Sequence, residues 1–206
     1  MLRLESPKRF EILGEDPDRT RFIAVEKIGI VVRDWLHAAI IEAECCRLLT
    51  RLMRECSHTL VINAPPAAVL DAFFEPEALA AWWDVTRAIC IPRPLGAYAL
   101  EWAPTQWRDE VLGRLGGALH GTVVEFKAGQ EFFVADLYWH PPDGEAIGPM
   151  AIEATCRLEG AVTLLHVRQS GYDKDSPRWT RYYDVMTVGW EPVLMALKQY
   201  LEKRWA

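Results

Sequence analysis

The chain has 206 residues, 50% of them hydrophobic, and a formal net charge of −6 with both signs spread along its length. That length suits one domain of ordinary size, or one domain with an appendage, and the apolar content is sufficient for a sizeable core. Because the charges are spread along the chain, we expect no nucleic-acid partner, since proteins that bind nucleic acid carry a clustered basic face. Charged residues interrupt the apolar runs well short of the roughly 20 residues of a membrane span, so no membrane partner is expected.

The cysteines indicate a reduced, cytoplasmic protein without a structural metal. None of them forms a CxxC pair or lies at zinc-ligand spacing from a histidine, and their number is odd. They are Cys45, Cys46, Cys56, Cys90 and Cys156. Residues 1–8 contain Glu5 and Pro7 and lack the apolar run of a signal peptide. We therefore expect a cytoplasmic location and no metal or organic cofactor.

Residues 1–56 form an N-terminal extension in this interpretation. The β-branched residues of 21–32 favour a strand, and Asp34 is a good cap for a helix over about residues 34–55. Apolar side chains recur along that helix at helical spacing, among them Ile41, Leu48 and Leu52. Such a stripe needs a covering surface, which we expect to be the main domain or a second copy in a homodimer.

The main domain is expected over residues 57–206 and opens with a strand at 58–63. Pro65-Pro66 then begins a short helix, because proline is tolerated in a first helical turn. Pro76 begins a second short helix that places Leu79, Trp82 and Trp83 on one face. Two short helices therefore follow the first strand.

Candidate strands and turns alternate through the middle of the chain. The turn at 127–130 lies between two alternating segments and predicts a β-hairpin. Residues 103–117 are polar and rich in glycine, which favours a connection. The expected strands are 84–91, 96–102, 118–126, 131–139, 149–158 and 161–170.

A long amphipathic helix is predicted to close the chain. Ser176-Pro177 is a favourable helix start, and apolar residues recur at alternating spacings of four and three to about Lys203. Gly189 lies inside this pattern, and we expect its missing side chain to allow close approach of the sheet or of a ligand.

Short motifs in this order resemble those of a known superfamily. They are Ala64-Pro65-Pro66 with Val69 and Phe73, Pro76-Glu77 with Trp82-Trp83, Gly121-Thr122-Val123, Leu137-Tyr138-Trp139, Thr163-Leu164-Leu165, Ser170-Gly171 and Gly189-Trp190. The set, over roughly residues 57–203, resembles the START-like (SRPBCC) superfamily, and within it the branch of homologues of the activator of heat-shock protein 90 ATPase. The resemblance implies an α+β helix-grip fold, like that of the birch pollen allergen. In it a curved antiparallel sheet wraps around a long C-terminal α-helix, preceded here by the N-terminal strand and helix extension.

A cavity between sheet and helix is expected, because one helix does not fill a strongly curved sheet. The chain has nine tryptophans, and large aromatic side chains are typical of ligand pockets. Alternation alone does not decide which strand faces are concave. The expected cavity-lining residues are Trp83, Tyr98, Trp102, Phe126, Phe133, Trp139, Met150, His166, Tyr183, Met186 and Trp190.

No catalytic residues are assigned, because GxSxG, P-loop and GxGxxG motifs are absent and the histidines lack metal-ligand spacing. The primary hypothesis is non-enzymatic binding of a small apolar or aromatic molecule. The resemblance implies two alternatives: a co-chaperone-like module that acts on a protein partner, and a cyclase- or hydrolase-type enzyme for an aromatic or polyketide-like substrate. Fold does not choose among them.

Overall fold

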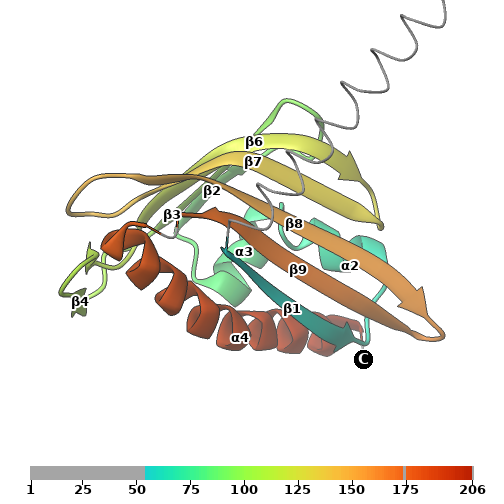
Figure 1. The fold of residues 1–206 in the computed structure, drawn as a ribbon. Helices are drawn as coiled ribbons and strands as arrows, with labels where there is room; N and C mark the ends of the chain where they lie inside the picture. Colours follow the sequence, from blue (N-terminus) through green and yellow to red (C-terminus); the bar gives the residue numbers. More distant parts are fainter. Residues whose placement is uncertain (1–53, 174, 206) are drawn as a thin grey trace, which may run out of the picture. The chain divides into compact units, whose positions relative to one another are not determined.

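A seven-stranded antiparallel sheet curves around one long helix in the computed structural model, which describes residues 54–173 and 175–205 (Figure 1). The strand order is β1-β9-β8-β7-β6-β3-β2, so strands from the two ends of the described chain pair with each other. The strands are β1 (Arg54–Ile62), β2 (Arg87–Cys90), β3 (Gly96–Trp102), β6 (Gly117–Lys127), β7 (Glu131–His140), β8 (Ile147–Glu159) and β9 (Val162–Tyr172).

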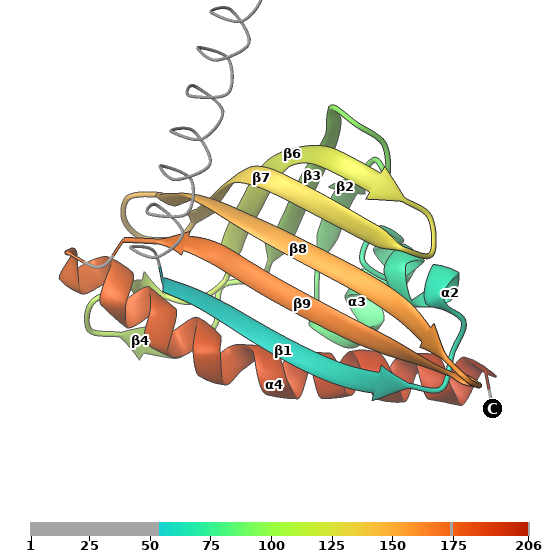
Figure 2. The same ribbon diagram turned by 45° about the vertical axis from the view of Figure 1, so that its right-hand side comes forward.

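The helices lie on the concave side of this sheet. Helix α4 (Pro177–Trp205) runs along it beneath β1 and β9, and the short helices α2 (Pro66–Asp71) and α3 (Pro76–Trp83) lie in the connection from β1 to β2 (Figure 2). The predicted α+β helix-grip fold, with two short helices after the first strand, is confirmed. Among the described residues, no helix combines the length and apolar character needed to cross a membrane.

Several element boundaries differ from those predicted. Arg54 and Glu55 belong to β1, not to the end of the predicted helix, whose remaining residues 34–53 lie outside the described part of the chain. The strand predicted at 84–91 begins only at Arg87, because Asp84 adopts a left-handed conformation with φ 54° and caps α3. The connection 103–117 contains a small hairpin, β4 (Arg108–Asp109) and β5 (Gly113–Arg114).

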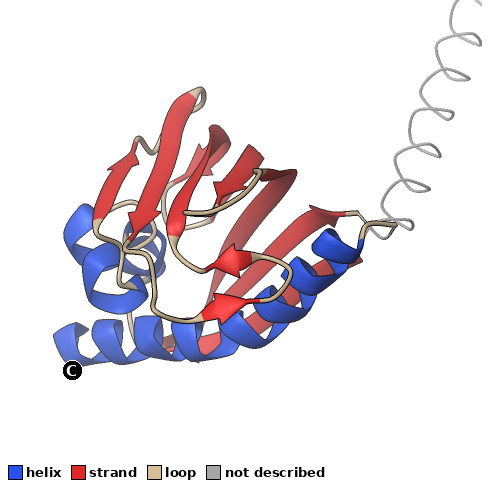
Figure 3. Cartoon of the chain, turned by 90° about the vertical axis from the view of Figure 1, so that its left-hand side faces the viewer, coloured by secondary structure: helices blue, strands red, loops and turns tan. Residues whose placement is uncertain are grey.

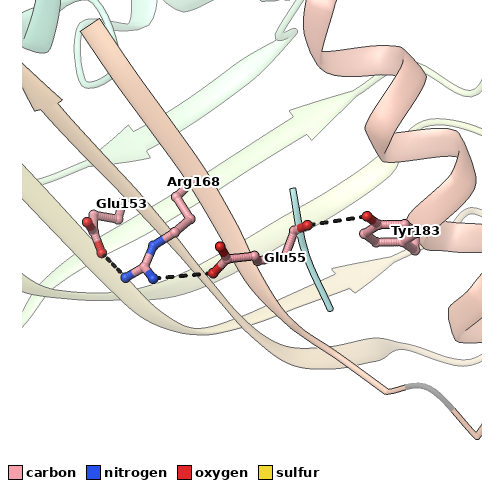
Figure 4. A network of polar contacts seen from close by, with 4 residues as sticks. All are labelled: Glu55, Glu153, Arg168 and Tyr183. Carbon is pink, nitrogen blue, oxygen red and sulfur yellow. Dashed lines mark hydrogen bonds and ion pairs between the residues drawn. The ribbon is translucent and has the colours of Figure 1, made fainter. Parts of the chain in front are cut away.

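A charged ladder on the outer face accounts for the early start of β1 (Figure 4). The Arg168 guanidinium on β9 contacts the carboxylates of Glu153 on β8, at 2.7 Å, and Glu55 on β1, at 3.4 Å. The Tyr183 hydroxyl on α4 donates to the Glu55 backbone carbonyl at 3.3 Å. These contacts fix the first residues of β1 to both β9 and α4, although partly exposed ion pairs contribute only about 0–1 kcal/mol each.

A β-bulge in β7 changes which residues face the core. Phe132 and Val134 point inward by strict alternation, but the next inward residues are Leu137 and Trp139. The register with β8 shifts between Val134 and Leu137, where Asp136 has φ 51°. One extra residue therefore reverses the alternation along the strand, as β-bulges do.

The two halves of α4 have different surroundings. In the C-terminal half, Leu194, Leu197 and Leu201 are each 3% exposed or less and fill the space beneath α2, α3 and β1. In the N-terminal half, Tyr182 and Trp190 are buried but border an unfilled space, described below. The core is thus closed at one end of the helix and open at the other.

Gly189 does not allow a close approach, contrary to the sequence-based expectation. A Cβ atom built at this position meets no atom within 4 Å. We therefore expect Gly189→Ala to raise the free energy of unfolding by about 0.5–1 kcal/mol, since glycine in a helix interior is that much less favourable than alanine. Urea unfolding followed by circular dichroism measures this, and a lower stability would contradict the open environment of Gly189.

Candidate functional site

A cavity of about 430 Å³ lies between the concave face of the sheet and the N-terminal half of α4. Its volume falls within the range of about 300–1,000 Å³ that is typical of small-molecule pockets. It is lined by Trp83, Asp84, Trp102, Ala103, Thr105, Leu112, Leu115, Gly116, Leu119, Leu137, Trp139, Ile152, Gln169, Tyr182, Val185, Met186 and Trp190.

Four parts of the chain form the walls. The sheet contributes inward-facing residues such as Leu119 on β6, Ile152 on β8 and Gln169 on β9. Helix α4 contributes Tyr182 and Val185 among others, and the end of α3 contributes Trp83. The fourth wall is the segment 103–116, which carries the β4–β5 hairpin. Figure 3 shows this hairpin beside the N-terminal half of α4.

Three of the lining tryptophans present apolar faces to the cavity, because their polar atoms are already bonded. Trp102 Nε1–H donates to the Trp83 carbonyl at 2.8 Å, and Trp139 Nε1–H donates to the Gly116 carbonyl at 2.8 Å. Trp190 Nε1–H donates to Gln169 Oε1 at 2.9 Å. These bonds fix the ring orientations, so the aromatic walls are formed before any ligand arrives.

The three tryptophans from β3, β7 and α4 do not fill the space between them. Trp102 and Trp190 each contact Trp83, with ring centroids 5.3 Å apart in both cases. Trp139 instead stacks on Tyr182 at 5.2 Å. The rings thus stand as separate walls of the cavity.

An ion pair attaches the hairpin wall to α4. The Asp109 side chain, 4% exposed, receives a hydrogen bond from Arg181 at 2.7 Å and accepts the backbone N–H groups of Val111 and Leu112 at 2.9 Å. The Arg181 hydrogen bond is the main cause that lowers the pKa of Asp109. Since Leu112 lines the cavity, this contact holds one wall in place.

The Asp109–Arg181 pair predicts a defined pH dependence. A carboxylate whose pKa is lowered by folding stabilises the folded state above its unfolded pKa of about 3.9, and this contribution disappears as pH falls through the folded pKa. Asp109→Asn should therefore be less stable than the wild type by a constant amount above about pH 5, and the gap should narrow as the pH falls below about 4 and close below the lowered folded pKa. Urea titrations across this range measure the gap, and a gap independent of pH would contradict the assignment.

The structure brings together five of the residues expected to line a cavity, namely Trp83, Trp102, Trp139, Met186 and Trp190. They come from α3, β3, β7 and α4, so the fold alone places them side by side. Their common features are a large side chain and a position on an inward-facing strand or helix surface.

Three further predicted residues belong to the closed core or adjoin it. Tyr98 is fully buried, with its ring 5.5 Å from that of Phe74, and Phe126 lies 5.0 Å from the same ring. Met150 lies buried behind the cavity wall, where its sulfur accepts a hydrogen bond from Gln169 Nε2 at 3.4 Å. Tyr98 and Phe126 pack against Phe74, which follows α2, and neither lines the cavity.

The remaining three predicted residues point away from the cavity. His166 lies on the outer face, where its Nδ1 is 3.1 Å from Thr59 Oγ1 on the neighbouring strand. Phe133 lies outside because it precedes the bulge that turns Trp139 inward. Tyr183 packs against Tyr172 and β1, and its neighbour Tyr182 occupies the cavity wall instead.

Sequence reasoning missed Gln169, Tyr182 and the hairpin residues Leu112 and Leu115. Gln169 could have been found, because Leu165 and Val167 precede it on the inward face at period two. The hairpin could not, since residues 103–116 carry no alternating pattern and their position depends on the contact between Asp109 and α4.

Two histidines without metal-ligand spacing in the sequence lie close together on the outer face. The Nε2 atoms of His120 on β6 and His140 on β7 are 2.9 Å apart, and both rings belong to a stack that includes Tyr138. Within residues 54–173 and 175–205, no group of three or more metal-ligating side chains occurs. A single shared proton is enough to explain the contact of the two rings.

Comparisons with known proteins support the fold. No curated protein matches the chain. A solved protein of Mesorhizobium loti is 18% identical, with a TM-score of 0.56, over 73% of this chain and 98% of that one. A protein of Chromobacterium violaceum is 24% identical, with a TM-score of 0.53, over 72% of this chain and 96% of its own. The Aha1 dimer of Colwellia psychrerythraea is 17% identical, with a TM-score of 0.52, over 72% and 96%. At these identities the similarity shows the fold alone.

The family match is more specific than the structural similarity. The family described as activator of Hsp90 ATPase homolog 1-like protein matches residues 63–202, which is more than half of the chain. The match begins directly after β1, ends within the last turn of α4 and agrees with the resemblance seen in the sequence. The chain therefore belongs to the family of activator of Hsp90 ATPase homolog 1-like proteins, within the START-like superfamily.

Proposed function

We propose that this protein binds a small, mostly apolar molecule in the cavity between the sheet and α4. The observation that carries the proposal is the cavity itself, about 430 Å³ in volume, with walls that include the indole faces of Trp102, Trp139 and Trp190, whose N–H groups are bonded within the protein. Burying apolar ligand surface against such walls is worth about 25 cal/mol per Å² of area removed from water. Because hydrogen bonds hold the walls, little ordering is needed on binding.

The cavity supplies little for catalysis. Its titratable lining residues are Asp84, at the exposed end of α3, and Tyr182, whose pKa is raised above the usual value mainly by burial. Burial therefore keeps Tyr182 protonated at neutral pH, which suits hydrogen bonding better than proton abstraction. This favours binding over the cyclase or hydrolase alternative.

A matched pair of methionines on α4 tests the proposal. Met186 lines the cavity, whereas Met195 lies on the same helix and is 41% exposed. We expect the uncharged fluorescent probe N-phenyl-1-naphthylamine to bind the wild type with enhanced emission. Met186→Trp should fill the cavity and weaken binding at least about tenfold, which corresponds to 1.4 kcal/mol. Met195→Trp should bind as the wild type does.

Two outcomes would overturn the proposal. The first is a folded wild type that does not bind the probe up to the solubility limit. The second is equal binding by all three proteins, which would place the probe on the surface and not in the cavity. Circular dichroism of each variant confirms that the comparison is made between folded proteins.

A protein-interaction role is the second candidate, favoured by exposed apolar side chains on and near the edge strand β2. Ile89 is 61% exposed, Leu95 is 86% exposed, and Val124 on the outer face of β6 is 50% exposed. Family membership and the Colwellia psychrerythraea dimer make a protein surface or a second copy suitable partners. Light scattering of the wild type and Leu95→Lys tests self-association, which the variant should weaken without changing probe binding.

A further inference from the structure

We infer that the cavity selects an uncharged, largely aromatic or alicyclic molecule that carries one hydrogen-bond acceptor, such as a ketone carbonyl, placed against the Gln169 carboxamide. This inference rests on the proposed binding function and specifies the ligand class of the same cavity. It follows from the orientation of Gln169, from its incomplete hydrogen bonding and from the charge of the lining.

The orientation of the Gln169 carboxamide is fixed by Trp190. An indole N–H is a donor only, so the atom that it contacts at 2.9 Å must be the carboxamide oxygen. The amide nitrogen of Gln169 therefore points the other way, toward Met150. Both Gln169, 4% exposed, and Trp190, 2% exposed, are buried, so the arrangement is shielded from bulk water.

The amide nitrogen lacks a strong acceptor. The Met150 sulfur, 3.4 Å away, is a weak acceptor, and an amide nitrogen carries two hydrogens to be satisfied. Tyr182 is the other polar group of this part of the lining, and its hydroxyl can donate a hydrogen bond. The polar part of the cavity is therefore rich in donors, and a ligand acceptor complements it.

The charge of the lining excludes an ionised ligand. Asp84 is the one charged side chain among the lining residues, and it lies exposed at the rim. Arg181, the nearby cation on α4, is committed to Asp109. A buried carboxylate ligand would thus lack a cationic partner, and burying an unpaired charge is strongly unfavourable.

Two isosteric probes isolate the carboxamide contribution: 2-acetylnaphthalene, which has a carbonyl, and 2-isopropenylnaphthalene, which has a methylene in its place. Their affinities are measured by quenching of tryptophan fluorescence in the wild type and in Gln169→Leu. The ratio of the ketone's affinity to the alkene's affinity should be about threefold to tenfold larger in the wild type than in Gln169→Leu. This is the range expected for one net hydrogen bond. Taking the ratio in both proteins cancels the different hydration of the two probes.

A second variant guards against structural damage in Gln169→Leu. Trp190→Phe keeps an aromatic ring but removes the donor that orients the carboxamide, so the ratio should fall in this variant too. The anion 2-naphthoate should bind the wild type at least about a hundredfold more weakly than the ketone, given the unfavourable burial of an unpaired charge.

The outcomes distinguish failure of the inferred ligand class from failure of the proposed binding function. An unchanged ratio in folded Gln169→Leu and Trp190→Phe, or tight binding of 2-naphthoate, would overturn the inferred ligand class while leaving apolar binding intact. Failure of both neutral probes to bind the wild type would instead overturn the proposed function. A ratio that falls in both folded variants supports the inference.

Discussion

Trp190→Ala should lower the free energy of unfolding by about 3–5 kcal/mol, the range for truncation of a fully buried tryptophan. The side chain is 2% exposed and lies at the boundary between the closed core and the cavity. Its removal deletes the ring contact with Trp83 and leaves the oxygen of Gln169 without its donor. An unpaired buried acceptor adds to the loss of packing.

The control for this prediction is a tryptophan of the same helix. Trp205 is 50% exposed near the end of α4, and Trp205→Ala should change stability by no more than about 0.5 kcal/mol. Urea unfolding of the three proteins, followed by far-ultraviolet circular dichroism, provides the comparison. Equal, small effects of both substitutions would show that Trp190 does not support the core.

Asp136→Pro should have a comparably large effect, because it removes the bulge in β7. Proline fixes φ at about −65°, whereas Asp136 has φ 51°. If the strand became regular with all its residues kept, strict alternation would turn Leu137 and Trp139 toward solvent. Burial of each such side chain is worth about 1.5–3 kcal/mol, so the substitution should greatly destabilise or unfold the protein.

Asp136→Gly is the matched control for this substitution. It keeps the extra residue and removes the strain of φ 51°, which disfavours a non-glycine residue by about 1–2 kcal/mol. We expect this variant to be at least as stable as the wild type. A stable Asp136→Pro variant that still binds the neutral probes would contradict the role assigned to the bulge.

The fold could be predicted because its information is local and ordered along the chain. Proline at the first turns of α2 and α3, the alternation in β3 and the four-and-three spacing in α4 each specify one element. Together with the family resemblance, their order gave the helix-grip architecture. The boundary at Arg54 was missed because the Arg168 ladder that extends β1 involves residues more than a hundred positions apart.

The cavity lining was only partly predictable, since it depends on which face of its strand each residue occupies and on tertiary contacts. Trp102 and Trp190 were found because large side chains on inward faces stand out in the sequence. Phe133 was assigned wrongly to an inward face, because nothing near Asp136 distinguishes a bulge from a regular strand. Polar residues such as Gln169 were overlooked because the search favoured aromatic side chains.

Heteronuclear NMR of the labelled protein during titration with 2-acetylnaphthalene tests the central claim most directly. Alternation along β9 places Gln169 at the cavity and Arg168 on the outer face, so adjacent residues report on opposite sides of the sheet. Binding in the cavity predicts saturable shifts of the Gln169 side-chain amide and of the Trp102 and Trp190 indole N–H signals, with the Arg168 guanidinium unaffected. Saturable shifts confined to the outer face, or no shifts at the solubility limit of the probe, would contradict it.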